Sequence, residues 1–233
     1  MNTDPIIAEL EILEQLVALD DIHLLEAGCG AAGLARRLLD RHAGTRVVGV
    51  DVDERQLAKN LAAPTPRLHF ERAGAQDLPF DDGAFDGAMM LKSLHHVPVA
   101  LMAQALGEMA RVLKPGGWLY VSEPVYAGAL NDVIRLYNDE GEVRAAAQAA
   151  LDRAVASGHW TQAAERRFEI PVRFEDFDDF ERRMMHPTFT DHHLDDALVE
   201  KVRAAFSPHQ RPDGARFTRP MHVRLLRPAA GSR

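Results

Sequence analysis

The chain has 233 residues, with 35 Asp and Glu against 27 Lys and Arg, a formal net charge of −8 and a single cysteine, Cys29. A chain of this length buries a sizeable core without disulfides or a structural metal, and one cysteine excludes both an internal disulfide framework and a multi-cysteine zinc site. The acidic balance argues against broad electrostatic capture of nucleic acid or of an anionic membrane, because both need a basic face.

Membrane and export signals are absent from the sequence pattern. No apolar run reaches the roughly 18–20 residues that a membrane span needs. The residues after Met1 lack the basic start and apolar core of a signal peptide. We therefore expect a cytoplasmic protein without a membrane partner. We also expect one domain over residues 1–233, because we find no internal repeat and no linker.

Strands alternate with helices through the first half of the chain. An amphipathic helix within residues 1–20, with Asp4 as its candidate cap, comes first. The predicted strands are 22–25, 46–51, 68–71, 85–91 and 118–122, and the predicted helices are 34–41, 54–61 and 99–113. This alternation predicts βαβ units and a parallel sheet, in which ligands bind beyond the carboxyl ends of the strands.

The second half gives a less regular pattern. We predict helical structure over 129–157, a strand over 168–174, a helix over 191–206 capped by Thr190 or Asp191, and a last strand over 221–226. Four arginines alternate with apolar residues near the end, which favours a sheet-edge strand over a nucleic-acid patch. They are Arg216, Arg219, Arg224 and Arg227.

Histidines and carboxylates gather between residues 186 and 196, which raises the question of a metal site. Adjacent histidines on a helix point in different directions, and no ligand pair has the i, i+4 spacing that a helical metal site favours. We therefore predict no metal there.

A glycine-rich turn follows the first strand. Glu26 ends that strand, and Gly28 and Gly30 open the turn into the next helix. Glycines there let the backbone approach a ligand, and the free N–H groups of a helix start attract a negative group. Asp51 closes the neighbouring strand, where its carboxylate can accept hydrogen bonds from a ribose diol. The spacing of Gly28, Gly30 and Gly33 also satisfies the dinucleotide pattern, so a nicotinamide cofactor stays open at this point.

Six motifs then occur in a fixed order along the chain. They are Leu24–Gly30, Val48–Asp51, Gln76–Phe80, Phe85–Asp86, Leu94–Val97 and Val112–Gly117. As a set they closely resemble the class I S-adenosylmethionine-dependent methyltransferases, in particular the small type 11 group. The resemblance runs from about Leu24 to Glu123.

The resemblance implies an α/β fold, a Rossmann-like seven-stranded mostly parallel sheet with helices on both faces and an antiparallel last strand. The segments 168–174 and 221–226 are the candidates for its sixth and seventh strands. It divides the chain into an N-terminal helix (1–20), a cofactor-binding half (22–123), a lid or substrate segment (124–167) and a C-terminal sheet and helix (168–233).

The resemblance also implies S-adenosyl-L-methionine as cofactor and assigns its binding residues. The backbone around Gly28 would face the methionine moiety, Asp51 the ribose, and Val52 the adenine. Leu91 and His96 would lie near the sulfur. The full cofactor set is Glu26, Gly28, Cys29, Gly30, Asp51, Val52, Ala75, Gln76, Asp77, Leu91 and His96.

The chain departs from the family pattern at two places. Ala32 stands where the family often has a third glycine, with Gly33 as partial compensation. Gly74 stands where the family often has the aspartate that bonds the adenine amino group, and Asp77 is a possible substitute.

Two residues are candidates for catalysis. His96 follows the fourth strand and could take a proton from the acceptor, although the His-His pair could also be a structural turn. Glu123 ends the fifth strand and could orient the acceptor, with a buried ion pair or a helix cap as the alternative.

The sequence therefore favours O- or N-methylation of a small-molecule acceptor, with S-adenosylhomocysteine as product. The alternatives are an RNA or protein methyltransferase of the same fold, a nicotinamide-dependent oxidoreductase, and a cofactor-binding protein without activity. The acceptor and the oligomeric state stay open.

Overall fold

The computed structural model describes residues 5–186 and 194–229. Within them seven strands form one sheet in the order β3-β2-β1-β4-β5-β7-β6. The strands are β1 (His23–Ala27), β2 (Arg46–Asp51), β3 (Leu68–Arg72), β4 (Phe85–Leu91), β5 (Leu113–Pro124), β6 (Trp160–Phe174) and β7 (Ala215–Pro228). All pairs are parallel except the two that β7 makes with β5 and β6. The predicted Rossmann-like α/β fold with an antiparallel last strand is confirmed.

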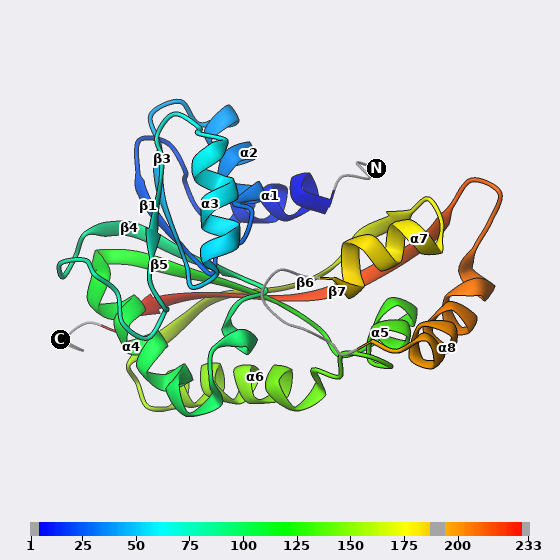
Figure 1. The fold of residues 1–233 in the computed structure, drawn as a ribbon. Coiled ribbons are helices and arrows are strands. Elements are labelled where there is room, and N and C mark those ends of the chain that lie inside the picture. The colour runs from blue at the N-terminus through cyan, green and yellow to red at the C-terminus, as the bar shows by residue number, and fades with distance from the viewer. Residues whose placement is uncertain (1–4, 187–193, 230–233) are drawn as a thin grey trace.

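Helices cover both faces of this sheet (Figure 1). One face carries α1 (Pro5–Leu16), α2 (Gly33–Arg41) and α3 (Glu54–Ala62), and the other carries α4 (Met102–Val112) and α6 (Gly141–Ala156). Because successive side chains of a strand point to opposite faces, Leu24 packs with the core under α1 and α2, whereas Leu25 packs with the core under α4 and α6.

Strands β6 and β7 continue well beyond the sheet. They pair from Trp160 opposite Pro228 as far as Phe174 opposite Ala215, so both are longer than the predicted 168–174 and 221–226. Their far ends carry a third core, seen at one end of the molecule in Figure 1. It includes α5 (Ala129–Ile134), α7 (Phe177–Phe180), η3 (Glu181–Met185) and α8 (Asp196–Phe206).

Several predicted boundaries differ from the structure. The helix predicted from 191 begins at Asp196, because the side chain of Asp195 caps it by accepting from Leu198 N at 2.7 Å. Thr190 and Asp191, like Asp4, lie outside the described residues. The segment 129–157 is broken at 135–140, and the segment 99–113 starts with the short turn η2 (Val99–Leu101) before α4. Two further short turns are η1 (Leu94–His96) and η4 (Ser207–His209).

The arginine-rich strand is not an edge strand, and this prediction was wrong. β7 lies between β5 and β6, and Arg224 is buried, bonded to Asp152 and Gln162. Alternation of arginine with apolar residues shows which side chains point to each face of a strand, but it does not show how many strands pair with it.

Among the described residues, every helix is too short or too polar to span a membrane.

Candidate functional site

The turn after β1 depends on two glycines with positive φ. Gly28 has φ 71°, and a Cβ atom there would lie 2.5 Å from Ser93 Cβ. Gly30 has φ 48°, yet a Cβ atom there would meet no protein atom within 4 Å. The first glycine is therefore required by packing inside the protein. The second faces open space at the carboxyl edge of the sheet, where α/β proteins bind ligands.

Side chains from two other elements hold Gly30 in place. Its N–H donates to Asp51 Oδ2 at 2.7 Å, and its carbonyl accepts from Asn60 Nδ2 at 2.7 Å. The amides of Gly28 and Cys29 both donate to the Val50 carbonyl. Sequence reasoning missed Asn60, which is buried on α3 at a position where an amphipathic helix normally buries an apolar residue.

Asp51 and Val52 lie beside this turn. The second oxygen of Asp51 accepts from Asp53 N at 2.9 Å, so the carboxylate ties the glycine turn to the start of α3. Each of its oxygens keeps a further lone pair for a ligand hydroxyl. Val52 is 64% exposed, a large apolar side chain left open next to the turn.

The segment around Gln76, which belongs to the predicted cofactor set, is held against α4. Leu78 N donates to Glu108, and Gln104 donates to the Gln76 carbonyl at 2.8 Å. The Gln76 side-chain amide occupies the space next to Gly74, since a Cβ atom there would come within 2.5 Å of it. Ala75 is buried and Asp77 is exposed. An amide thus lies where the family often has a carboxylate.

Glu26 is the most unusual group at this edge. Its side chain is buried, and among the described residues its Oε2 atom has no hydrogen-bond partner. Burial raises the pKa of Glu26 to about 8, although the charge of Lys92 opposes the rise. A buried carboxyl with a free acceptor atom costs stability unless a donor reaches it.

Cys29 and Leu91 act as packing residues in the structure. Cys29 is buried against the core under α1 and α2, and burial raises the pKa of its thiol. Leu91 is half-buried against the same core. A raised pKa leaves the thiol protonated at neutral pH, so the structure offers no reactive thiolate at this position.

Glu123 organises the turn that carries both histidines. Its Oε1 accepts from Leu94 N at 2.9 Å, and its Oε2 accepts from His95 Nδ1. The other ring nitrogen of His95 lies 3.7 Å from Glu140 Oε2, and Arg144 donates to that carboxylate at 2.6 Å. Burial by itself would raise the pKa of Glu140, but the charges of His95 and Arg144 outweigh it and lower that pKa. Both oxygens of Glu123 are thus engaged within the protein.

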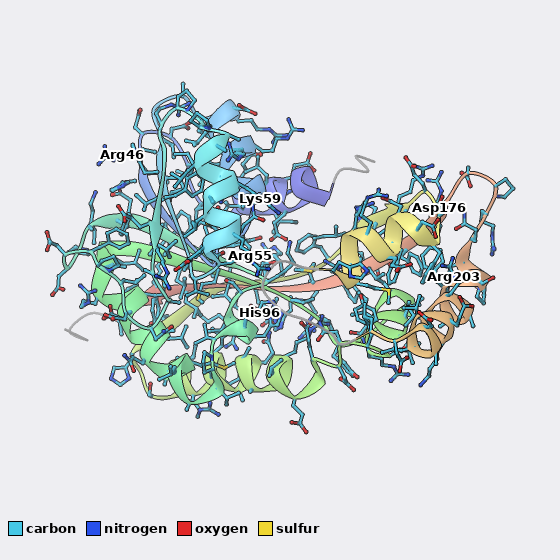
Figure 2. All side chains as sticks on the ribbon, viewed as in Figure 1. Arg46, Arg55, Lys59, His96, Asp176 and Arg203 are labelled. Carbon is cyan, nitrogen blue, oxygen red and sulfur yellow. The ribbon has the colours of Figure 1, made fainter. Side chains whose placement is uncertain are left out.

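His96 is placed differently from His95. It is exposed, and Figure 2 shows it between the sheet and α6. Burial by surrounding atoms, followed by the charge of His95, lowers the pKa of His96. Its imidazole is therefore neutral at pH 7 and can accept a proton.

One group in the described part of the chain has metal-ligand spacing. The candidate ligand atoms of His95, His96 and Glu140 lie within 4.8 Å of one another. Glu123 already occupies His95 Nδ1, and Arg144 neutralises Glu140. The stretch 186–196, in which we predict no metal, is described only in part. His186 Nε2 lies 3.6 Å from Glu181 Oε1, and residues 187–193 fall outside the described ranges.

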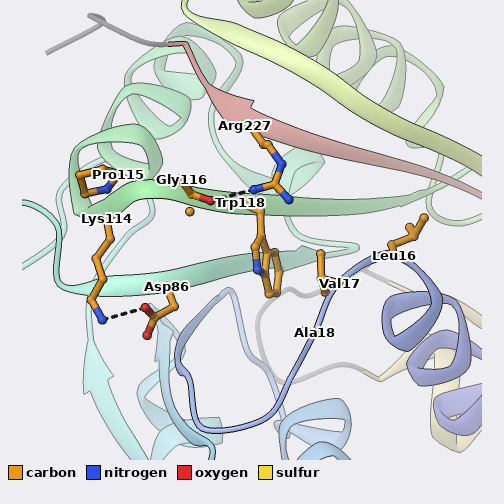
Figure 3. Close-up of a pocket in the computed structure, with 10 residues that line it drawn as sticks. Leu16, Val17, Ala18, Asp86, Lys114, Pro115, Gly116, Trp118 and Arg227 are labelled. Atoms are coloured by element: carbon orange, nitrogen blue, oxygen red, sulfur yellow. Dashed lines mark hydrogen bonds and ion pairs between the residues drawn. The ribbon is translucent and has the colours of Figure 1, made fainter.

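A pocket of about 400 Å³ lies at the opposite edge of the sheet, where β5 begins (Figure 3). Its charged groups are engaged within the protein: Lys114 with Asp86, and Arg227 with the Gly116 carbonyl. Ligands of parallel sheets bind at the carboxyl edge, so this pocket is separate from the glycine turn.

Comparison with known proteins identifies this architecture. The sequence pattern of the family described as "Methyltransferase domain" matches residues 25–121. Residues 25–121, which are less than half of the chain, carry the sequence pattern of this methyltransferase domain.

The similar proteins include an O-methyltransferase and a C-methyltransferase. The chain is 33% identical over 106 residues to O-methyltransferase resE of Aspergillus sclerotiorum, covering 43% of this chain and 39% of that protein. It is 34% identical over 125 residues to 24-methylenesterol C-methyltransferase 2 of Oryza sativa subsp. japonica, covering 49% and 32%. The chain thus spans well under two thirds of the length of these relatives.

Solved structures share the fold over nearly the whole chain. A candidate methyltransferase from Bacillus halodurans superposes with a TM-score of 0.65 at 17% identity, covering 96% of this chain and all of that one. The [4+2]-cyclase SpnF superposes with a TM-score of 0.61 at 21% identity, covering 96% and 82%. At these identities the likeness concerns the fold alone.

Methyltransferase domains of this family use S-adenosylmethionine, and three observations of this structure fit that cofactor. Gly30 leaves room at the turn, Glu26 Oε2 offers an acceptor to an ammonium group, and Val52 offers an exposed apolar face to a base. Asp51 adds acceptors for hydroxyl groups. Ala32, where the family often has a third glycine, has φ 52°, so the turn adopts the left-handed conformation despite its methyl group.

The two glycines of the methyltransferase turn are expected to respond differently to alanine. Gly28→Ala places a methyl against Ser93 at a positive φ, so we expect a large loss in the free energy of unfolding. Gly30→Ala meets no protein atom and should cost only about 1–2 kcal/mol of backbone strain. It should nonetheless weaken S-adenosylhomocysteine binding at least tenfold. Urea denaturation and calorimetry measure the two effects.

The control for this pair is Gly107→Ala, a helical position with open space around its Cβ, which should keep binding and gain up to about 1 kcal/mol. Unchanged binding by the Gly30→Ala protein would contradict the role of Gly30.

Glu26→Gln should stabilise the free protein at high pH. Folding takes up a proton at Glu26 between the carboxyl's usual pKa and about 8, so stability should fall with rising pH over this window and level off above it. The slope is about 1.4 kcal/mol per pH unit. The glutamine variant should lose this slope, be more stable than the parent at pH 8, and bind S-adenosylhomocysteine more weakly.

Unfolding free energies at pH 5, 6, 7 and 8 test this expectation. Glu11→Gln, on the exposed face of α1, is the matched control and should follow the parent. Parallel profiles for Glu26→Gln and the parent would show that Glu26 is not protonated on folding.

Proposed function

We propose that the protein transfers a methyl group from S-adenosylmethionine to an oxygen or nitrogen atom of a small-molecule acceptor. The observation that carries this proposal is the glycine turn at the carboxyl edge, held by Asp51 and Asn60 and left open at Gly30. The family pattern supports methyl transfer, and the name of O-methyltransferase resE supports an oxygen acceptor, whereas the sterol relative is named a C-methyltransferase.

The protein does not need to form a covalent bond to the transferred methyl group. When bound, S-adenosylmethionine supplies a methyl group on a positively charged sulfur, which is already an electrophile. The chain has to align the acceptor atom and keep water away. A base is needed only where the acceptor arrives protonated, as an alcohol or an ammonium does.

His96 is our candidate for that base. It is exposed on the turn after β4, and its lowered pKa keeps its imidazole neutral at pH 7. Glu123 takes a different role from the one first expected of it. Since its oxygens hold Leu94 N and His95, we assign it to positioning the turn that presents His96.

The net charge of −8 favours a small acceptor over RNA. Protein methylation, a nicotinamide-dependent oxidoreductase and a cofactor-binding protein without activity are the competing outcomes of the tests below.

Titration calorimetry with S-adenosylhomocysteine and fluorescence titration with NADH separate a methyltransferase from the oxidoreductase, and turnover with an acceptor separates an enzyme from a protein that only binds the cofactor. We expect S-adenosylhomocysteine to bind and NADH not to bind. Failure of S-adenosylhomocysteine to bind would refute the proposed function, and binding of NADH alone would favour the oxidoreductase.

Removal of the His96 imidazole should slow transfer. With an acceptor found by following S-adenosylhomocysteine release over a panel of phenols and amines, we expect His96→Ala to lower kcat by about 10²–10⁴. The parent rate should rise with pH, with a midpoint below the usual histidine pKa of about 6.5, because the imidazole must be neutral. His209→Ala, on the distant η4 turn, is the control. Unchanged turnover for His96→Ala would refute the role.

A further inference from the structure

A network of polar contacts connects the sheet to α5 and α6 through the turn η1. Glu123, at the end of β5, accepts from His95 Nδ1, and the other ring nitrogen of His95 lies 3.7 Å from Glu140 Oε2. Arg144 donates to that oxygen from Nε at 3.1 Å and from Nη2 at 2.6 Å. Its Nη1 atom donates to Asn131 Oδ1 on α5 at 3.0 Å. Side-chain contacts thus join four elements that are separate along the chain.

The ionisable groups of this network are largely buried. The side chains of Glu123 and His95 are 2% and 3% exposed, and those of Glu140 and Arg144 are 14% and 12% exposed. Buried ion pairs stabilise a fold no better than apolar side chains of similar size, because each charge must lose its hydration. Stability alone therefore does not account for these groups at the carboxyl edge of the sheet.

His96 lies at the exposed end of the network. Its ring packs against the ring of His95, with centroids 4.1 Å apart and an angle of 41° between the planes. One ligand atom each from His95, His96 and Glu140 lies within 4.8 Å of the other two. His96 is exposed and His95 is buried. The buried ring is therefore the surface on which the exposed ring packs.

Glu140 connects this turn to the start of α6. It directly precedes Gly141, the first residue of the helix, and its Oε1 atom accepts from Asn138 Nδ2 at 3.0 Å. The helix belongs to the segment 124–167, for which the sequence predicts a lid or substrate segment. The approach of Glu140 to His95 thus links that segment to the turn that carries His96.

We propose that His95 and Glu140 are positioning residues, which orient the imidazole of His96 for the acceptor and connect it to α6. This inference rests on the proposed function and adds the residues that prepare its base. Neither residue has to touch the acceptor, because both act through His96. A base that is held in one orientation before the reaction transfers a proton faster than one that must first be ordered.

The charges around His96 give opposite expectations for two substitutions. Burial is the largest influence on the pKa of His96 and lowers it, and the charges of His95 and Arg144 lower it further. The carboxylates of Glu140 and Glu123 raise this pKa, since they favour the imidazolium. Loss of the charge of His95 should therefore raise the pKa of His96, and loss of the charge of Glu140 should lower it.

Nuclear magnetic resonance titration of the His96 ring tests these expectations without an acceptor. The sample is the full chain saturated with S-adenosylhomocysteine, and His96→Ala identifies the signal. Glu140→Gln keeps an acceptor for Arg144 and should move the titration midpoint of His96 down by about 0.5 pH units or more. His95→Asn keeps a donor near the position of Nδ1 and should move the midpoint up. Glu140→Asp keeps the charge and should stay closer to the parent.

Turnover provides a second measurement. Glu140→Gln and His95→Asn should each lower kcat about tenfold, because the base is less well oriented. The midpoint of the pH–rate profile should move in the same direction as the ring titration. Both variants should bind S-adenosylhomocysteine as the parent does, which shows that the cofactor turn is folded.

Asp179→Asn is the matched control. Asp179 is a buried carboxylate that accepts from Arg183, four residues further along, at the far end of β6 and β7. Its replacement should lower the free energy of unfolding and leave the His96 titration and turnover unchanged.

Midpoints that stay at the parent value in both variants, or that move in the same direction, overturn the inference and leave the proposed function intact. Loss of turnover on chelation, with recovery on added Zn²⁺, also overturns it, because His95, His96 and Glu140 would then be metal ligands. A parent protein that does not bind S-adenosylhomocysteine fails at the earlier step.

Discussion

The hydrogen bond from Gly30 N to Asp51 Oδ2 is the contact on which the rest of the site depends. It joins the turn after β1 to the end of β2, and Asn60 completes the arrangement from α3 by holding the Gly30 carbonyl. Both backbone polar groups of Gly30 are thus satisfied from the side of the protein, which leaves the other side of the turn free. A backbone fixed in this way needs no rearrangement to receive a ligand.

Desolvation is the second organising force, and it works against stability. Glu26 keeps a buried acceptor atom that has no partner among the described residues. This feature costs free energy in the protein alone, and a ligand that donates a hydrogen bond to the atom would offset the cost. The apolar cores on both faces of the sheet offset this cost, which lets an unsatisfied group persist at its carboxyl edge.

The long paired strands β6 and β7 extend beyond the rest of the sheet. Their far end carries a separate aromatic core around Phe174 and Phe206. From the sequence, the two strands could be recognised only over part of their length, because the longer pairing alternates exposed arginines with apolar side chains. Extension of a strand is decided by its partner, and the partner lies some fifty residues away along the chain.

The sequence by itself determined the βαβ order, the glycine turn and Asp51, because these depend on local periodicity and on residue types close together in the chain. Only the tertiary structure decided that β7 lies inside the sheet, that Glu123 holds His95, and that Asn60 holds the Gly30 carbonyl. The physical reason is the separation along the chain over which each interaction acts. Backbone preference acts over a few residues, whereas charge and desolvation act between side chains that folding brings together from distant segments.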